Sequence, residues 1–223
     1  FYPATLRRSE WLDFYCGSFS TVEVNNSFYR LPAERVFGRW RDVSPEGFVF
    51  AVKVSRFITH VKRLNDAAAP VANFLGRSRL LGDKLGPLLY QLPPQLKRDD
   101  GRLEEFLGIL PRDVRHAFEF RHRSWLCDDV FALLARHGAG LCVYDTPDFT
   151  VPLVATSDFA YLRFHGGQAA NGGRYLAADL ARWARCIADF KVATVFVYFN
   201  NDAGGFAVDS ALALKRLLAG SRL

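Results

Sequence analysis

Short runs of β-branched and aromatic residues alternate with segments of helical periodicity along most of the chain. The runs occupy residues 21–26, 48–54, 86–93, 115–121, 140–145, 159–166 and 194–201. Helical, amphipathic spacing occurs at 6–15, 70–85, 102–110, 128–137, 179–190 and 209–218. Such alternation predicts βα units around a parallel sheet, and seven strands favour a barrel over a small doubly wound sheet. We therefore expect an α/β protein with a TIM-like (β/α) barrel.

Two features depart from a regular eightfold barrel. Only seven strand-like runs occur and the sequence opens on a helical segment, so we expect the first strand to precede Phe1. The connection TPDFTVPLVATSDF, at 146–159, contains two prolines and no helical period, so we expect it to be irregular. No internal repeat or low-complexity linker divides the chain, and residues 1–223 are expected to form one domain.

Within these runs, the polar residues occupy alternate positions and would therefore lie on the same face of each strand. In a parallel barrel, alternate strand residues point outward under the helices or inward into the lumen. In FEFR, at 118–121, Phe118 and Phe120 are expected to face the helices while Glu119 and Arg121 face inward. The same reasoning directs inward Glu23, Asn25, Ala51, Lys53, Gln91, Asp145, Arg163, His165, Tyr198 and Asn200. The polar ones lie near the carboxyl ends of their strands, where barrel active sites form.

Two interpretations of this polar lumen compete. In the first, the charges form a satisfied ion network that only fills the barrel. They do balance, with Glu23, Glu119 and Asp145 set against Lys53, Arg121 and Arg163. In the second, they form a functional site, which we favour because burying six charges is costly and an apolar filling would usually be at least as stable.

The residue types suggest acid and base chemistry. We predict Glu119, Asp145, His165 and Lys53 as catalytic residues, the first three as groups that exchange protons. Lys53 can polarise a carbonyl, form an imine or pair with a carboxylate, and we favour pairing over imine formation. A metal held by the acids and His165 is conceivable but not favoured, because three cations compete with it; the cofactor stays unknown.

Further candidates lie in loops and among aromatic residues. The loop SRFITHVKRLND, at 55–66, carries a basic cluster that favours capture of an anion, although a solvated loop is an equal alternative for each residue. Residues 165–175 are glycine-rich without matching a phosphate-binding motif, and we expect a mobile loop there. The aromatic residues expected at the mouth would stack on a flat ligand or simply pack; they are Phe28, Tyr29, Trp125, Tyr144 and Tyr198. The predicted ligand-binding residues are Glu23, Asn25, Tyr29, Arg56, His60, Arg63, Gln91, Arg121, His122, Trp125, Arg163, Tyr198, Asn200, Asn201 and Asp202.

Composition narrows the class of protein. The sequence contains neither an uninterrupted apolar stretch of membrane-spanning length nor the apolar segment of a signal peptide. The four cysteines are widely spread and form no CxxC pair, which favours reduced thiols and a cytoplasmic protein without a membrane partner. A net charge of +6 favours an anionic ligand but falls short of a basic nucleic-acid arm.

The sequence resembles the YecE-like family of barrel proteins, named for a domain of unknown function. The resemblance covers nearly the whole chain and is carried by FYP, TVEVNNSFYRLP, FAVKVSRFITHVKRL, LLGDKLGPLLYQLPP, HAFEFRHRSW, YDTP, YLRFHG and VYFNND. It implies a TIM-like barrel with the shared residues around its mouth. It implies no particular reaction, substrate or cofactor.

Three functions remain in view. We favour an enzyme that uses acid and base chemistry on a small anionic molecule, such as a phosphorylated sugar or a nucleotide fragment. The first alternative is a protein that binds or processes nucleic acid, an analogy at the level of the fold. The second is a barrel that binds the same ligand without turnover, which the sequence does not separate from the enzyme.

Overall fold

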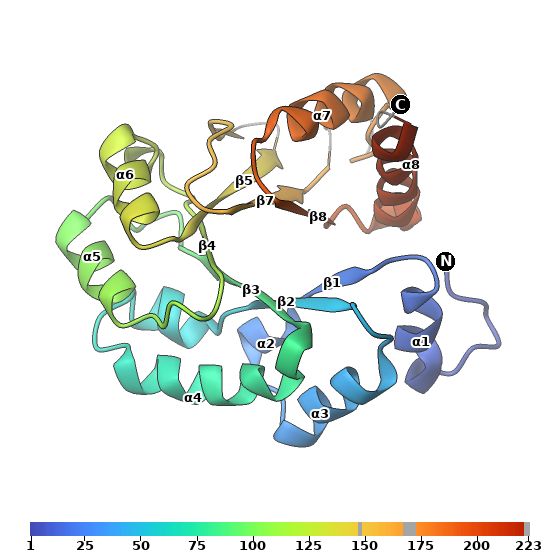
Figure 1. Cartoon of the computed structure of the whole chain (residues 1–223), viewed down its shortest axis with the longest axis horizontal. Coiled ribbons are helices and arrows are strands. Elements are labelled where there is room, and N and C mark those ends of the chain that lie inside the picture. Colours follow the sequence, from blue (N-terminus) through green and yellow to red (C-terminus); the bar gives the residue numbers. More distant parts are fainter. Residues whose placement is uncertain (147–148, 167–172, 221–223) are drawn as a thin grey trace.

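The computed structural model describes residues 1–146, 149–166 and 173–220. The strands are β1 (Thr21–Val24), β2 (Val49–Lys53), β3 (Leu85–Gln91), β4 (His116–Glu119), β5 (Gly140–Thr146), β6 (Phe149–Thr150), β7 (Phe159–Phe164) and β8 (Thr194–Phe199). They pair in the order β1-β2-β3-β4-β5-β7-β8, all parallel, and β6 pairs antiparallel with β5. Each of the seven predicted runs overlaps one parallel strand, and the sheet curls into a nearly closed TIM-like barrel, as predicted (Figure 1).

Helices surround the strands in chain order (Figure 1). They are α1 (Trp11–Cys16), α2 (Asn26–Tyr29), α3 (Glu34–Val43), α4 (Ala68–Ser78), α5 (Asp100–Gly108), α6 (Asp128–Arg136), α7 (Ala177–Asp189) and α8 (Phe206–Gly220). The six predicted helical segments each overlap one of them, whereas the short α2 and the longer α3 were not predicted. Across the described ranges, no helix has the length and apolarity needed to cross a membrane.

The irregular connection predicted at 146–159 is confirmed for its described part. Residues 149–158 contain the two-residue strand β6 and no helix. Pro152 and the absence of a helical apolar period account for this course, because proline lacks the amide hydrogen that a helix interior uses. The glycine-rich stretch predicted as a mobile loop falls mainly on residues 167–172, which lie outside the described residues.

Strand parity divides the interior into two packed regions. Outward residues such as Phe118 and Leu162 join the helix-covered core, in which they are fully buried. Inward residues form a separate apolar cluster inside the lumen, made of Ala51, Leu89, Ala117, Cys142, Phe159, Tyr161, Phe196 and Tyr198. This cluster lies along the strands before their polar carboxyl ends. The lumen is therefore filled, and its polar groups gather at the mouth.

A bulge between β2 and β3 sets the register of Lys53. Phe50 pairs with Leu85 whereas Val52 pairs with Leu88, so β3 contributes one extra residue at Gly86-Pro87. Proline fits there because a bulge leaves an amide outside the ladder. A Cβ atom on Gly86 would lie only 2.5 Å from Cγ1 of Val49 and 3.1 Å from the carbonyl oxygen of Phe50.

Replacing Gly86 by alanine is expected to lower the free energy of unfolding by about 1–3 kcal/mol, because a rigid side chain and backbone must shift to admit the methyl group. Gly38→Ala is the matched control: nothing lies within 4 Å of a Cβ at that position, inside α3. It should raise stability by about 0.5–1 kcal/mol. Urea denaturation of both variants checks this, and a Gly86→Ala variant as stable as wild type would contradict the close approach.

Candidate functional site

A guanidinium group in the lumen joins two buried carboxylates. Arg163, on β7, donates from Nη1 to Oε2 of Glu119 at 2.6 Å and from Nη2 to Oε1 of Glu23 at 2.7 Å. Its Nε atom donates to the other Glu23 oxygen at 2.9 Å. The side chains of Arg163 and Glu23 are each 3% exposed and that of Glu119 is 0% exposed. The inward parity of β1, β4 and β7 thus places a row of ion pairs across the barrel, in the order Glu23, Arg163 and Glu119. We call this row the ion ladder.

The ladder continues toward the mouth through Arg121. This guanidinium pairs with Oε1 of Glu119 and lies over the ring of Tyr144, 4.2 Å from its centroid. Its Nη2 atom also donates to Nε2 of His165 at 3.0 Å. Because a guanidinium only donates, Nε2 must accept, so the His165 ring is neutral and carries its proton on Nδ1.

Two further side chains complete the bonding around Glu23. The hydroxyl of Tyr161 donates to Oε2 at 2.6 Å, and Nδ2 of Asn25 donates to Oε1 at 2.9 Å. Every oxygen of Glu23 and Glu119 is thus hydrogen-bonded within the lumen. Such satisfaction is what a buried carboxylate requires to stay charged.

Burial and neighbouring charges lower the pKa values of Glu119 and His165. Burial opposes ionisation of Glu119, but Arg163 and Arg121 outweigh it and lower its pKa to about 2. Burial, together with the Arg163 guanidinium, lowers the pKa of His165 to about 4. At neutral pH Glu119 is therefore an anion and His165 is neutral. A carboxylate this acidic is a weak proton acceptor, so the geometry favours a positioning role for Glu119.

Lys53, at the end of β2, differs from the two arginines. Of the side chains that the structure describes, none brings a carboxylate oxygen within 4.0 Å of its ammonium group. Its Nζ atom instead lies 4.4 Å from the centroid of the Phe28 ring. Burial and the nearby Arg163 lower its pKa to about 8. The carboxylate pairing favoured from the sequence is therefore not found among these residues.

The inward strand residues that the structure describes carry an excess of positive charge. Three cationic side chains, Lys53, Arg121 and Arg163, face two carboxylates, Glu23 and Glu119. The predicted balance counted Asp145 among the inward acids. Asp145 does not face the lumen. Among these five side chains the cations therefore outnumber the carboxylates by one when Lys53 is protonated.

Asp145 lies on the opposite parity from the one predicted. Inward Cys142 and the Tyr144 ring under Arg121 mark the even-numbered residues of β5 as lumen-facing. Asp145 pairs in register with outward Phe164, and its carboxylate interacts with the hydroxyl of Tyr175. The prediction that Asp145 faces inward was wrong. Cys142 and Tyr144 are the lumen-facing residues of β5, and Asp145 follows Tyr144 with the opposite parity.

Three predicted ligand-binding residues lie away from the ladder. Trp125 is fully buried in the outer core, stacked on Phe120, with its indole N–H donating to the Leu96 carbonyl at 2.7 Å. Its placement at the mouth was therefore wrong. His122 caps the turn at residues 123–125, where Nδ1 accepts from the Ser124 amide at 3.2 Å. Tyr29 is 75% exposed on α2.

The loop at 55–66, with the basic cluster predicted to bind an anion, follows β2; we call it the basic rim. Arg56 and Arg63 are exposed, whereas His60 is half-buried and packs edge-on against Phe28, with the ring centroids 5.0 Å apart. The segment contains a π-helical turn, η2 (Phe57–Val61), and then non-glycine residues at positive φ, including Arg63 at 50° and Leu64 at 72°. Such strain and π-helical geometry are frequent at functional sites, which supports a role for this rim.

The remaining candidates come from β3 and β8. Gln91 is half-buried with inward parity, in register with Glu119. Tyr198 is buried, and its hydroxyl lies 2.8 Å from Oγ1 of Thr21. Nδ2 of Asn200 is buried without a hydrogen-bond partner among the residues described. Nδ2 of Asn201 donates to the Gly173 carbonyl at 3.0 Å, and Asp202 is exposed.

A cavity of about 770 Å³ lies along the seam where β1 and β8, the two edges of the strand order, face each other. Five predicted residues line it: Glu23, Asn25, Tyr198, Asn200 and Asp202. Apolar side chains of α8 form much of its outer wall. Its volume is in the range of small-molecule sites, and it extends the polar mouth toward the side-chain amide of Asn200.

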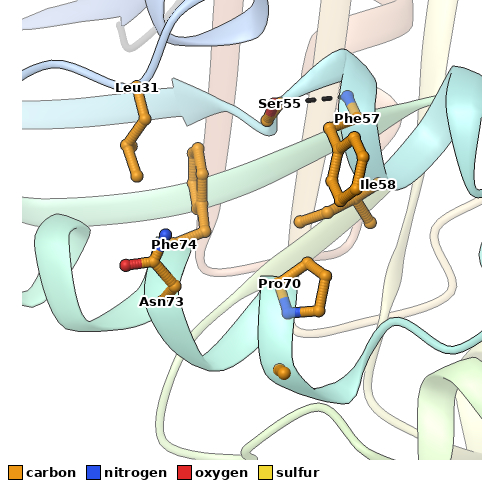
Figure 2. A pocket seen from close by; sticks show the side chains of 8 residues that line it. Leu31, Ser55, Phe57, Ile58, Pro70, Asn73 and Phe74 are labelled. Carbon is orange, nitrogen blue, oxygen red and sulfur yellow. Dashed lines mark hydrogen bonds between the residues drawn. The ribbon is translucent and has the colours of Figure 1, made fainter.

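A second pocket, of about 380 Å³, lies between η2 and α4 and is shown in Figure 2. Its lining is apolar apart from Ser55 and Asn73, and no charged residue contributes to the described lining. None of the predicted site residues belongs to it. This pocket is therefore separate from the polar site.

Two residues of the site were missed in the sequence. Tyr161 shares the inward parity of Arg163, two residues earlier on β7, so the same alternation was a sufficient signal. Cys142 lies with Sγ 3.7 Å from Oε2 of Glu119, and burial raises the pKa of its thiol. No cluster of three or more His, Cys, Asp or Glu side chains suited to a metal occurs in the described ranges.

Fold and site together define a TIM-like barrel with a charged, partly open mouth. A family model described as "Protein of unknown function DUF72" matches residues 1–222, and the chain belongs to this family. It is 28% identical to the UPF0759 protein YunF of Bacillus subtilis over 97% of this chain and 89% of that protein. It is 33% identical to the UPF0759 protein YecE of Escherichia coli over 50% of this chain and 41% of that protein. The predicted YecE-like resemblance is confirmed.

Solved structures agree on the fold. A crystal structure of a DUF72 family protein from Thermotoga maritima superposes with a TM-score of 0.86 and 29% identity, covering 98% of this chain and 92% of that one. The structure titled SacUVDE superposes with a TM-score of 0.59 at 6% identity, over 96% of this chain and 86% of that one. At that identity the likeness shows the fold alone.

Removing one acid of the ladder should destabilise the protein far more than removing Lys53. Glu119→Gln leaves two arginines facing a neutral amide and is expected to lower the free energy of unfolding by about 3–5 kcal/mol. Lys53→Met loses no ion pair among the described residues, gains an apolar contact with Phe28, and should stay within about 1 kcal/mol of wild type. Urea denaturation measures both. Equal losses would mean that Lys53 belongs to the structural network.

Proposed function

We propose that this protein is an enzyme that binds a small anionic molecule at the barrel mouth and transforms it by acid and base chemistry. The observation that carries the proposal is Lys53, a cation without a carboxylate partner among the described residues, beside a buried ladder whose acids are already paired. A partly buried cation of this kind is stabilised when an anion binds.

Other features support an anionic ligand. The excess positive charge at the mouth attracts it, and exposed Arg56 and Arg63 extend that charge outward. The buried Nδ2 atom of Asn200 lacks an acceptor among the described groups, so an anionic oxygen would satisfy it. A phosphorylated sugar or a related phosphate or carboxylate has the required charge and size.

The proposed roles follow from protonation state. Lys53, with a pKa lowered to about 8 by burial and Arg163, is the group best suited to exchange protons near neutral pH. His60 and His165 are neutral imidazoles, since burial lowers the pKa of both. Glu23 and Glu119 would position Arg163 and Arg121 around the ligand.

One alternative is binding of single-stranded nucleic acid across the rim. It is favoured by two exposed aromatic side chains, Tyr29 at 75% and Phe57 at 47%, the second of which adjoins exposed Arg56 in the chain. Exposed aromatics beside cations allow bases to stack while phosphates are neutralised. This alternative requires binding of an oligonucleotide that weakens steeply with salt, and no binding at low salt would exclude it.

Inorganic phosphate and sugar phosphates are expected to raise the melting temperature of the wild-type protein. At a ligand concentration ten times its dissociation constant, the gain is about 1.4 kcal/mol, or roughly 3–6 °C for a chain of this size. Lys53→Met should abolish the shift. The control Lys191→Met removes an exposed lysine just before β8, at the opposite end of the barrel, and should keep it.

Thermal scans at matched ionic strength decide the outcome. An equal shift in wild type and Lys53→Met, or no shift with any phosphate or carboxylate, would contradict the proposed site. A shift that sodium chloride of the same ionic strength reproduces would also contradict it, because it would reflect screening rather than binding.

A further inference from the structure

Lys53 is fixed in place by backbone contacts and an aromatic ring. The Ser27 hydroxyl lies 2.7 Å from the Lys53 carbonyl oxygen and 3.1 Å from that of Val24. These contacts tie the ends of β1 and β2 together and fix the Cα from which the side chain extends. Phe28 covers one side of the amine. The Nζ atom is therefore held near the mouth, and none of the described residues places a carboxylate within ion-pair distance of it.

The surrounding charges favour loss of that proton. Besides burial, Arg163 and Arg121 lower the pKa of Lys53, while Glu119 and Glu23 offset part of the effect. An ordinary lysine is almost fully protonated near neutral pH and is a poor nucleophile. A lysine that is desolvated and lies beside other cations becomes a nucleophile, because its neutral form is populated.

A neutral imidazole lies against the same aromatic ring. His60 packs on Phe28, with its Nδ1 atom 2.9 Å from Oγ1 of Thr59. Burial and the nearby Lys53 charge lower the pKa of His60, so its imidazole stays neutral and is a weaker base than Lys53. Glu119 is no better as a base, since both of its oxygens already bond to arginines. The proton that Lys53 releases therefore passes to solvent, which reaches its partly exposed side chain.

We infer that Lys53 forms an imine with an aldehyde or ketone group of the anionic ligand, an inference that rests on the function proposed above. The ammonium of Lys53 first releases a proton to solvent, and the amine lone pair attacks the carbonyl carbon. A carbon–nitrogen bond forms, and the carbonyl electron pair moves onto oxygen, which takes a proton from nitrogen. The hydroxyl then leaves as water with a proton returned from solvent, which leaves a protonated imine.

This chemistry defines the ligand class as a carbonyl compound that carries a phosphate or carboxylate. The protonated imine keeps the positive charge that Lys53 had as an ammonium, so attraction to the anionic group persists after the bond forms. Arg163 and Arg121 pair with the carboxylates of Glu23 and Glu119, so these two acids are occupied and do not pair with the amine. Pairing of Lys53 with an acid would have opposed the reaction by stabilising the ammonium form.

Reductive trapping tests the inference on the wild-type protein. The protein is incubated with glyceraldehyde 3-phosphate and sodium cyanoborohydride, and modified lysines are identified by peptide mass spectrometry. Uncharged glyceraldehyde is the matched probe without the phosphate. We expect the adduct at Lys53 to exceed that at exposed Lys191 by at least about tenfold, and only with the phosphorylated aldehyde. An adduct at Lys53 no greater than at Lys191 overturns the inference.

A parallel measurement separates this inference from the proposed function. The same preparation is titrated with inorganic phosphate and followed by thermal shift. A shift without an adduct at Lys53 overturns imine formation and leaves anion binding standing, whereas neither signal overturns both. Lys53→Arg keeps the cation but cannot form an imine, so it should retain the phosphate shift and lose the adduct.

Discussion

The buried pairing of Arg163 with Glu23 and Glu119 is the interaction on which the rest of the lumen depends. It ties β7 to β1 and β4 across the barrel through bonds of 2.6 to 2.9 Å, above an apolar cluster that excludes water from below. Charges this deeply buried are stable only when their partners are in place, so the ladder requires all three strands to be correctly registered. The ladder also holds Arg121 through Glu119, and hence it sets the arrangement of the mouth before any ligand arrives.

The two interpretations of the charged lumen each apply to a different part of it. Glu23, Glu119 and Arg163 are buried and mutually satisfied, as a network that supports the fold would be. Lys53 is partly exposed and, within the described chain, lacks an acid; Asn200 has a buried donor without an acceptor there. Unmet charge and hydrogen-bonding capacity are features that a ligand can satisfy. The proposed site therefore uses the ladder as its support and the uncommitted groups as its contacts.

Much of this arrangement was predictable, and the failures have physical causes. Runs of β-branched and aromatic residues identified the seven parallel strands. Period-two alternation then identified the inward parity of residues such as Glu119 and Arg163, because each side of a barrel strand meets a distinct environment. It failed at Asp145, where polarity was taken as the sign of the lumen although inward Cys142 defines the series. α3 was not predicted although its apolar residues have helical spacing, because Gly38 interrupts the segment and glycine lowers helix propensity. Contacts between strands distant in sequence require the folded chain, as does the finding that none of the described acids lies beside Lys53.

The most direct test of the account is the ionisation of Lys53 in the folded protein, measured by NMR of the side-chain amine with Lys53→Arg used to assign the signal. The account predicts a pKa of about 8, lowered by burial and Arg163, that rises when inorganic phosphate binds, because a bound anion stabilises the ammonium form. A pKa at or above the ordinary value of 10.5 that phosphate leaves unchanged would contradict it. That result would mean that Lys53 is solvated or paired with an acid, and that the mouth lacks the uncommitted charge on which the proposed site rests.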